Sequence, residues 1–329
     1  MKLLESYKGK SVLVTGGLGM IGSFAATKAA DMGASVKVMD CLLPHHGGNL
    51  FNLKGYEDSI EIMNGDIRDR EKMKQVVEGV DLIVHCAAHV VYPHSMSDPF
   101  LDLEINGFGH LSVLEACRHV NPGARVVFTS SRMKYGNISE LPVNENHPAN
   151  PLVIYGAHKL LGENYQNIYH KHFGIEYTNV VIPNPYGPRQ HMQHHHYGLV
   201  NWFIRQCMEN NPISIFGDGL QLRDYIYVED IVTAILLAGA SDSTVGETLN
   251  LGNEKGITFK YMVETVVGTV GQGSYEHVDW PDNYKAIETG GYVADISKAR
   301  SLGYEPAFTF EEGVARTHEF YKSNWKNYW

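Results

Sequence analysis

Residues 11–40 read SVLVTGGLGMIGSFAATKAADMGASVKVMD, and this stretch decides the fold. Residues 11–15 form a short β-branched run, which is typical of a buried strand in a parallel sheet. A glycine-rich turn follows, and then a helical pattern that is stopped by Gly33. A second apolar strand, residues 36–39, ends at Asp40. The stretch therefore predicts one β-α-β unit.

The turn of this unit carries Gly16, Gly19 and Gly22, spaced between the strand and the helix. Such glycines allow a sharp turn, close approach of a pyrophosphate to the backbone, and close packing of helix on strand. Amide groups at the helix N-terminus then hold the phosphates. Asp40 can accept hydrogen bonds from both ribose hydroxyls, and it would repel a 2′-phosphate. The unit predicts an NAD site; the alternative is a tight structural turn with Asp40 as a solvated strand end.

The same rhythm continues along the chain. Strands are expected at 60–63, 81–84, 125–129 and 176–182, and helices at 70–78, 98–119 and 152–173. Strands that alternate with helices imply an α/β fold, here a Rossmann-type doubly wound parallel sheet covered on both faces. Proline and glycine crowd together from residue 183. We therefore expect an NAD-binding Rossmann domain at 1–182 and a smaller C-terminal α/β lobe, mainly 183–329, that binds substrate. Residues of about 225–252 look like strand, helix and strand, and are expected to return to the first sheet.

Composition limits the classes of function. The 329 residues are 43% hydrophobic with a net charge of −10, which supports a large core and argues against global disorder. No basic run suggests a nucleic-acid surface, and no apolar run is long enough to span a membrane. The cysteines form no CxxC pair and the first residues lack the apolar core of a signal peptide. We expect a cytoplasmic protein with reduced thiols.

Two short stretches carry candidate chemistry. In YGAHK, Tyr155 and Lys159 stand four residues apart in a predicted helix, so their side chains share one face. In SSRMKYG, Ser131 lies at the carboxyl end of a predicted strand, where open parallel sheets bind their ligands. The simpler interpretation makes Tyr155 and Lys159 a surface pair and Ser131 a strand-end cap.

Further blocks stand in a characteristic order. They are TGGLGMIGS (15–23), NGDIRD (64–69), HCAAH (85–89), SSRMKYG (130–136), YGAHK (155–159), NPYGPRQ (184–190), IFGDGLQLRDYIYVEDI (215–231) and ADISKARSLGY (294–304). With these blocks the chain resembles the extended short-chain dehydrogenase/reductase family. Within it, the chain is similar to the NAD-dependent nucleotide-sugar epimerase/dehydratase group of the UDP-glucose 4-epimerase type.

The resemblance implies a role for individual residues. Tyr155 matches the general base and acid, Lys159 matches the lysine that holds the nicotinamide ribose, and Ser131 matches the hydroxyl that contacts the reacting oxygen of the sugar. The implied cofactor-binding residues are Gly16, Gly19, Met20, Ile21, Gly22, Asp40, Asp66, Ile67, Ala87, Ala88, Tyr155, Lys159 and Pro183. The implied substrate-binding residues are Ser131, Asn184, Arg223 and Lys285, of which the last three would contact the diphosphate.

The proposed role of Tyr155 as a base depends on the pKa of its phenol. A free tyrosine has a pKa near 10, so little phenolate exists at neutral pH. Lys159 and a cationic nicotinamide ring both favour the anion, so we expect a lowered pKa for Tyr155. Tyr155 would then remove a proton from a sugar hydroxyl while hydride leaves the same carbon.

The residues after Ser131 discriminate among reactions. Dehydratases of this family place Asp and Glu there, and decarboxylases usually place Glu at the second position, but this chain has Arg132 and Met133. Epimerisation at C4 is therefore our leading interpretation. A 4-ketoreductase is the first alternative, although it would normally use NADPH, and a 4,6-dehydratase or decarboxylase is the second. A non-catalytic NAD sensor or a nucleic-acid-binding member would be a different class, but such members tend to lose the tyrosine or the lysine.

Arg132 and a histidine-rich stretch stay open at this level. Arg132 is a substrate-binding candidate because it can pair with a carboxylate on the sugar; alternatively, it anchors a loop or pairs with a glutamate. The stretch QHMQHHHYG (190–198) can form a metal site or a loop that closes over the nucleotide, and we predict no metal because the family chemistry needs none. The substrate would be a nucleotide-diphosphate sugar. The resemblance also implies a homodimer formed through helices 98–119 and 152–173.

Overall fold

The computed structural model describes residues 2–44, 46–195, 198–285 and 288–329. Its first unit is strand β1 (Ser11–Thr15), helix α2 (Met20–Asp31) and strand β2 (Ser35–Asp40). β1 pairs in parallel with β2, and the amide of Gly16 donates to the carbonyl of Met39 at 2.8 Å. The predicted β-α-β unit is confirmed.

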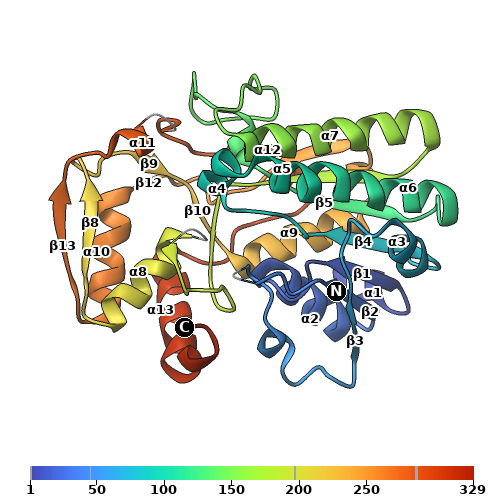
Figure 1. Cartoon of the computed structure of the whole chain (residues 1–329), viewed down its shortest axis with the longest axis horizontal. Helices are drawn as coiled ribbons and strands as arrows, with labels where there is room; N and C mark the ends of the chain where they lie inside the picture. Colours follow the sequence, from blue (N-terminus) through green and yellow to red (C-terminus); the bar gives the residue numbers. More distant parts are fainter. Residues whose placement is uncertain (1, 45, 196–197, 286–287) are drawn as a thin grey trace.

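A seven-stranded parallel sheet forms the centre of the molecule (Figure 1). Its other strands are β3 (Ile60–Asn64), β4 (Leu82–His85), β5 (Arg125–Ser131), β6 (Tyr177–Ile182) and β11 (Glu247–Asn250). The order is β11-β6-β5-β4-β1-β2-β3, so successive strands run outward from β1 on one side and then from β4 on the other. This reversal opens a crevice at the carboxyl ends of β1 and β4, where ligands of such sheets bind. The predicted doubly wound α/β fold is confirmed.

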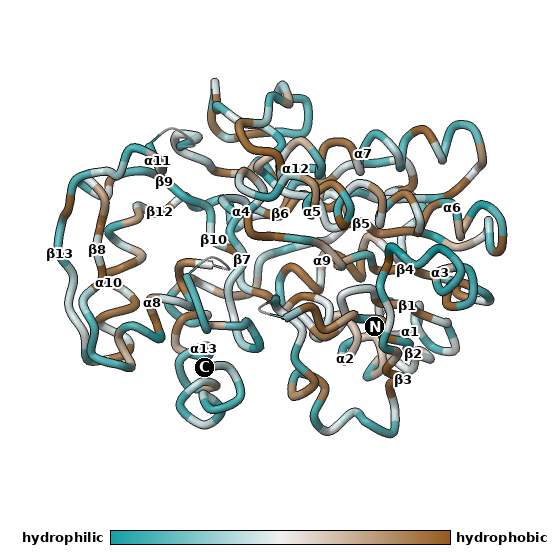
Figure 2. The backbone as a smooth tube through the Cα atoms, in the orientation of Figure 1, coloured by the Kyte–Doolittle hydropathy of each residue, from teal (hydrophilic) through white to brown (hydrophobic). Residues whose placement is uncertain are grey.

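Helices cover both faces of the sheet (Figure 1). On one face, α2 and α9 (Val228–Ala240) pack on side chains such as Val14 and Val84. On the other face, α3 (Arg70–Val77), α6 (His110–Val120) and α7 (Ile154–Phe173) pack on side chains such as Leu13 and Ile83. Figure 2 shows the central strands as largely hydrophobic segments. Because both faces are covered, the inner strands β1, β4, β5 and β6 are buried along nearly their whole length, whereas the edge strand β3 is largely exposed.

The helix expected at 98–119 is assembled from three pieces. They are α5 (Pro99–Asp102), η2 (Leu103–Gly109), which is a π-helix, and α6. A short helix, α4 (Tyr92–Ser97), precedes them. π-Helical turns are uncommon and are often found near functional sites. Here the π-helix packs against α7, the helix that carries Tyr155.

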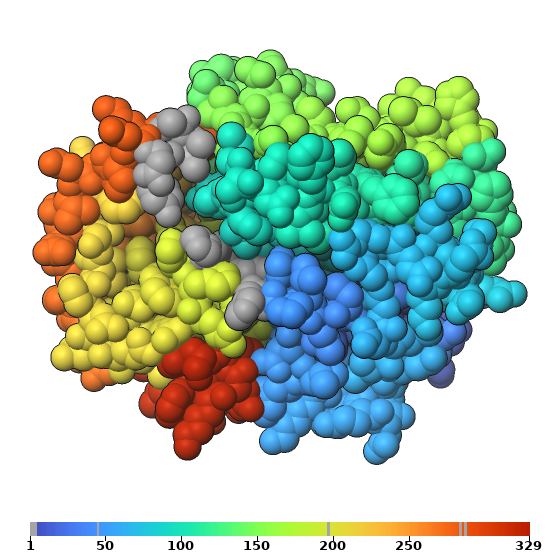
Figure 3. Space-filling model, in the orientation of Figure 1, coloured from blue at the N-terminus to red at the C-terminus, as the bar shows by residue number. Residues whose placement is uncertain are grey.

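The chain beyond β6 builds smaller layers. Its strands pair as β7 (Asn184–Tyr186) with β10 (Tyr225–Tyr227), β8 (Pro212–Phe216) with β13 (Ser274–Val278), and β9 (Leu222–Arg223) with β12 (Ile257–Thr258). Its main helices are α8 (Leu199–Met208), α10 (Phe259–Val270) and α13 (Phe310–Asn324). In the space-filling view, the yellow and orange surface of these segments lies beside the blue and green surface of the sheet-bearing part (Figure 3).

Residues 225–252 do include the expected strand, helix and strand. β11 joins the seven-stranded sheet beside β6, and α9 covers one of its faces next to α2. β10 instead pairs with β7, outside that sheet. The division of the chain into two domains at residue 182 stays a prediction.

The remaining elements are short. They are α1 (Lys2–Tyr7), η1 (Leu50–Leu53), η3 (Arg132–Lys134), η5 (Asp242–Thr244), α11 (Asp282–Lys285), α12 (Ser297–Ser301) and η6 (Trp325–Asn327). Among the residues that the structure describes, no helix combines the length and the apolar character needed to cross a bilayer.

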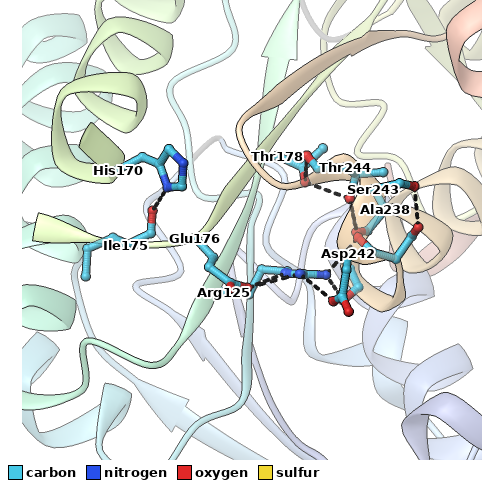
Figure 4. Close-up of polar contacts among 11 residues, drawn as sticks. Arg125, His170, Ile175, Glu176, Thr178, Ala238, Asp242, Ser243 and Thr244 are labelled. Atoms are coloured by element: carbon cyan, nitrogen blue, oxygen red, sulfur yellow. Dashed lines mark hydrogen bonds and ion pairs between the residues drawn. The ribbon is translucent and has the colours of Figure 1, made fainter. Parts of the chain in front are cut away.

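The amino end of β5 is fixed by Arg125, whose side chain is almost entirely buried (Figure 4). Its Nε donates to Glu176 at 3.1 Å and its Nη2 donates to Asp242 at 3.0 Å. Its Nη1 donates to the carbonyls of Gly239 at 3.2 Å and Ser241 at 3.0 Å. This one guanidinium therefore ties β5 to the start of β6 and to the connection between α9 and β11.

Candidate active site

The glycine-rich turn packs so closely at two of its glycines that a side chain there would collide with the backbone, and at the third it leaves space for a cofactor. Gly16 has φ of +66°, and a Cβ there would lie 2.6 Å from the amide nitrogen of Ala87. A Cβ on Gly22 would lie 2.3 Å from the carbonyl oxygen of Gly16. At Gly19, the N-cap of α2, the nearest atom would be 3.4 Å away, so the protein itself leaves that space open. These positions fit the pyrophosphate of a dinucleotide at a helix N-terminus.

Beyond the turn, the carboxylates of Asp40 and Asp66 line the cavity that the turn borders. Asp40 accepts from the amides of Leu18 at 3.1 Å and Leu42 at 2.9 Å, and burial raises its pKa. A carboxylate has about four lone-pair sites, so two stay available for ribose hydroxyls. Burial also works to raise the pKa of Asp66, but hydrogen bonds from Arg68 lower it overall.

Tyr155 and Lys159 lie in the first turns of α7, and both are buried. The amide of Tyr155 donates to the Ser95 hydroxyl at 3.0 Å, which fixes the helix start against α4. The Lys159 ammonium donates to the Thr129 carbonyl at 2.9 Å and lies 5.8 Å from the centre of the Tyr155 ring. The carboxyl end of β5 and the start of α7 thus bring Ser131, Tyr155 and Lys159 to one cavity.

The pKa of Tyr155 was expected to be lowered, but the surroundings of the phenol raise it. Burial raises the pKa of the Tyr155 phenol well above its usual value, and the charge of Asp102 adds to the rise. Only a hydrogen bond with Ser131 acts to lower it. The expected lowering by Lys159 is therefore wrong for the protein groups alone. Burial disfavours the charged form of a phenol. The Lys159 ammonium, for its part, donates a hydrogen bond to the Thr129 carbonyl.

Lys159 is itself perturbed. Burial lowers the pKa of its ammonium to about 8, although Cys86 and Asp102 act in the opposite direction. Lys159 therefore binds its proton far less tightly than a free lysine, for which the pKa is about 10.4. A buried lysine of this kind can exchange its proton near neutral pH.

A layer of buried side chains behind the site was missed by reading the sequence. The Ser130 hydroxyl donates to Glu163 at 2.5 Å, and the Lys134 ammonium donates to both oxygens of the same carboxylate at 2.9 and 2.7 Å. Glu163 belongs to α7, whereas the other two residues flank the turn after β5. This ion pair fixes the turn that carries Ser131 relative to the helix that carries Tyr155.

Asp102 forms a second support, between two histidines. It accepts from His158 at 2.6 Å and is bonded to His89 at 2.8 Å. Burial alone would raise the pKa of Asp102, but these hydrogen bonds lower it to about 2. His158 stands between Tyr155 and Lys159 on α7, and His89 follows the cavity-lining Ala88. The HCAAH block contains His89 and the YGAHK block contains His158, but neither block indicated that both histidines would meet Asp102.

One continuous cavity of about 680 Å³ connects these groups. Every cofactor-binding residue that the sequence predicted lines it: Gly16, Gly19, Met20, Ile21, Gly22, Asp40, Asp66, Ile67, Ala87, Ala88, Tyr155, Lys159 and Pro183. Of the predicted substrate-binding residues, Ser131, Arg132, Asn184 and Arg223 line it as well. Lys285 is exposed at the end of α11 and is not among the lining residues, so its role stays a prediction.

The far side of the cavity comes from the second part of the chain. Arg223 pairs with Glu288 at 2.5 Å and donates to the carbonyl of Gly290 at 2.9 Å. Asn184 donates to the carbonyl of Asp224 at 2.7 Å. Reading the sequence did not find the lining residues Thr289 and Trp280, since no motif marks the loop from which they come.

The histidine-rich stretch borders the cavity through His191 and His195. His191 and His194 lie 3.3 Å apart at their Nε2 atoms. His196 lies outside the described residues. Within the described ranges, no group of three or more His, Cys, Asp or Glu side chains could hold a metal ion.

Fold and site together place the chain among the dinucleotide-binding proteins of the Rossmann type, with one cavity that extends from the glycine-rich turn past the start of α7. Residues 12–252 match the NAD dependent epimerase/dehydratase family, and the chain belongs to that family. Its cofactor is accordingly NAD.

Named relatives cover almost the whole chain and differ in activity. UDP-glucose 4-epimerase of Mycolicibacterium smegmatis is 30% identical over 94% of this chain and 98% of its own length. UDP-glucuronic acid decarboxylase 1 of Xenopus tropicalis is 30% identical over 98% of this chain and 74% of its own. The solved UDP-N-acetylglucosamine 4-epimerase of Methanobrevibacter ruminantium M1, in complex with UDP-N-acetylmuramic acid, has a TM-score of 0.89. It is 28% identical and covers 96% of this chain and 99% of its own.

Proposed function

We propose that the protein epimerises a nucleotide-diphosphate sugar at C4 through a transient 4-keto intermediate. The observation that carries this proposal is the convergence of Ser131, Tyr155 and Lys159 on one cavity. That cavity is shared by the glycine-rich turn on one side and by Asn184 and Arg223 on the other. It thus offers a dinucleotide site and a second anionic-ligand site with an acid/base group between them.

The chain's own residues handle the proton. Ser131 orients the reacting hydroxyl by hydrogen bonding, and Tyr155 accepts its proton as oxidation at the same carbon begins. Lys159 supplies positive charge behind the phenol, since its Nζ lies 5.8 Å from the ring centre. NAD, when bound, provides the hydride acceptor and donor. A neutral phenol cannot accept a proton, and burial raises the pKa of Tyr155 in the protein alone. We propose that Tyr155 becomes the phenolate base only in the complex with NAD, where the charges of Lys159 and of the oxidised ring would together favour the anion.

The substrate would be held mainly by its nucleotide. We propose that Arg223 and Asn184 contact the diphosphate, and that the base lies against the ring pair Phe216 and Trp280. Their centres are 5.6 Å apart, and both line the cavity. Firm nucleotide binding leaves the hexose free to present either face, as epimerisation requires.

Dehydration and decarboxylation find less support. Expelling water between C5 and C6 needs two further acid/base groups. The positions after Ser131 are occupied by Arg132 and Met133, and both line the cavity. A guanidinium stays protonated and a thioether does not titrate, so neither can serve.

Incubation with a panel of nucleotide sugars tests the proposal. The product of the preferred sugar should have unchanged mass and inverted configuration at C4, as read by mass spectrometry and NMR. A product lighter by water or by carbon dioxide would overturn it in favour of a dehydratase or a decarboxylase.

We also propose a homodimer formed through η2–α6 and α7. Large apolar side chains are exposed on both segments: Phe108 is 46% exposed on η2, and Ile168 is 47% exposed on α7. Static light scattering of the wild type should give twice the chain mass of 36.8 kDa. Ile168→Glu should shift it toward the monomer, and a monomeric wild type would contradict the proposal.

A further inference from the structure

Arg132 places a positive charge at the reacting end of the cavity. It follows Ser131 directly, as the first residue of η3, and it lines the cavity. Its Nη1 donates to the Thr289 hydroxyl at 3.0 Å, and its Nη2 lies 3.5 Å from Oδ1 of Asn184. Both of these partners also line the cavity. The guanidinium therefore bridges the end of β5 and the second part of the chain across the ligand space.

Within the described part of the chain, this arginine forms no direct ion pair. Among the described residues, no carboxylate lies within 4.0 Å of its guanidinium, and its buried Nε makes no hydrogen bond. A guanidinium has five N–H donors, and the contacts above use two of them, one at the limit of hydrogen-bond distance. Arg132 is half-buried in the cavity wall. Withdrawing a charge from water without a counter-ion is costly, so its unused donors favour an anion that arrives with a ligand.

The surrounding groups do not neutralise it. Arg223 adds a second positive charge. The Glu288 carboxylate acts on Arg132 from a distance, but its ion pair is with Arg223, at 2.5 Å. Asp224 lies nearby, but its oxygens accept from the amides of Asn253 at 2.8 Å and Ala294 at 3.0 Å. Burial raises the pKa of Asp224 to about 7, so it carries only part of a negative charge at neutral pH. The remaining neighbours, Tyr92, Tyr225 and Tyr292, are uncharged phenols.

We propose that Arg132 binds a carboxylate on the sugar itself, so that the preferred substrate is an acidic nucleotide sugar such as a uronic acid. This inference rests on the proposed function, because it assigns a substrate class to the same site. A planar carboxylate matches the terminal N–H groups of a guanidinium and gives short, charge-assisted hydrogen bonds. Arg223 and Asn184 bind the diphosphate in this proposal, so the two arginines bind two different anionic groups of the substrate.

Calorimetric binding to the NAD-loaded protein separates the two arginines. The ligands are UDP, UDP-glucose and UDP-glucuronate. Wild type should bind UDP-glucuronate at least 10-fold more tightly than UDP-glucose. Arg132→Met should weaken UDP-glucuronate on the order of 100-fold and change UDP and UDP-glucose by less than about 3-fold. Arg223→Met should weaken all three ligands alike.

A conservative variant keeps the test usable if Arg132→Met fails to fold. Arg132→Lys keeps the charge and loses the planar fork, so it should weaken UDP-glucuronate by about 10-fold. Equal binding of UDP-glucose and UDP-glucuronate by wild type overturns the inference. Equal weakening of all three ligands by Arg132→Met overturns it as well, because Arg132 would then serve the diphosphate.

Turnover distinguishes this failure from failure of the proposed function. Interconversion of UDP-glucose and UDP-galactose without any preference for the uronate would sink the carboxylate assignment alone. Tight, Arg132-dependent binding of UDP-glucuronate without formation of a C4 epimer would support the carboxylate assignment and sink epimerisation.

Discussion

The two ends of strand β5 carry arginines with opposite surroundings. Arg125, at the amino end, donates to two carboxylates and two carbonyls (Figure 4). Arg132, just past the carboxyl end, has one hydroxyl and one distant amide oxygen. The protein satisfies the hydrogen bonds of Arg125, whereas Arg132 is the arginine that we propose binds a ligand. On this account, the arginine at the amino end contributes to stability, and the charges at the carboxyl end serve binding and chemistry.

The largest expected effect sharpens the chemical side of this comparison. Tyr155→Phe removes only the phenol hydroxyl, which is the group that we propose transfers the proton. It should therefore lower kcat about 10³-fold, a typical loss for a general acid/base. NAD affinity should stay within about 3-fold, as read by fluorescence titration. Turnover within 10-fold of wild type would show that another group handles the proton.

Lys159→Met tests whether the buried charge of Lys159, beside the carboxyl end of β5, lowers the stability of the protein. The pKa of this buried lysine is about 8, against about 10.4 in an unfolded chain. Between these values the unfolded chain binds more protons, so wild-type stability rises with pH through that window. The variant should lack this rise and be more stable at pH 7, by up to about 3 kcal/mol. Urea denaturation at pH 7 and pH 10 measures it, and a difference independent of pH would contradict the assignment.

Arg125→Met tests the amino end. It removes four hydrogen bonds from a nearly buried guanidinium, but its two carboxylate partners are largely exposed and can be hydrated. We expect a loss of about 2 kcal/mol in the free energy of unfolding. Binding of NAD and of UDP-sugars should be unchanged, in contrast to Arg132→Met. A selective loss of uronate binding in Arg125→Met would break the comparison between the two ends.

The smallest expected effect concerns the glycine-rich turn. A Cβ at Gly19 meets only one atom, at 3.4 Å, so Gly19→Ala should fold normally while the added methyl enters the cofactor space. NAD binding should weaken about 10-fold, or 1.4 kcal/mol. Gly268→Ala is the matched control, since nothing lies within 4 Å of a Cβ at this position in the last turn of α10. Equal NAD affinity in both variants would contradict the assigned pyrophosphate position.

Local pattern was enough to predict the first β-α-β unit, the parallel sheet and the carboxyl-end position of Ser131. These features depend on neighbours in the sequence and on the general rule for open α/β sheets. The pairing of β10 with β7 and the support of α7 by Asp102 could not be predicted, since they join residues far apart in the chain. The raised pKa of Tyr155 was missed for a different reason: burial outweighs the hydrogen bond from Ser131, and burial was not visible in the motif.

The most direct test of the account follows a deuterium label at C4 of the preferred UDP-sugar. If oxidation and reduction occur at this carbon within one binding event, the C4 epimer should keep the deuterium, as read by NMR in ordinary water. Loss of the label to solvent, or retention of the label without inversion at C4, would contradict the central claim.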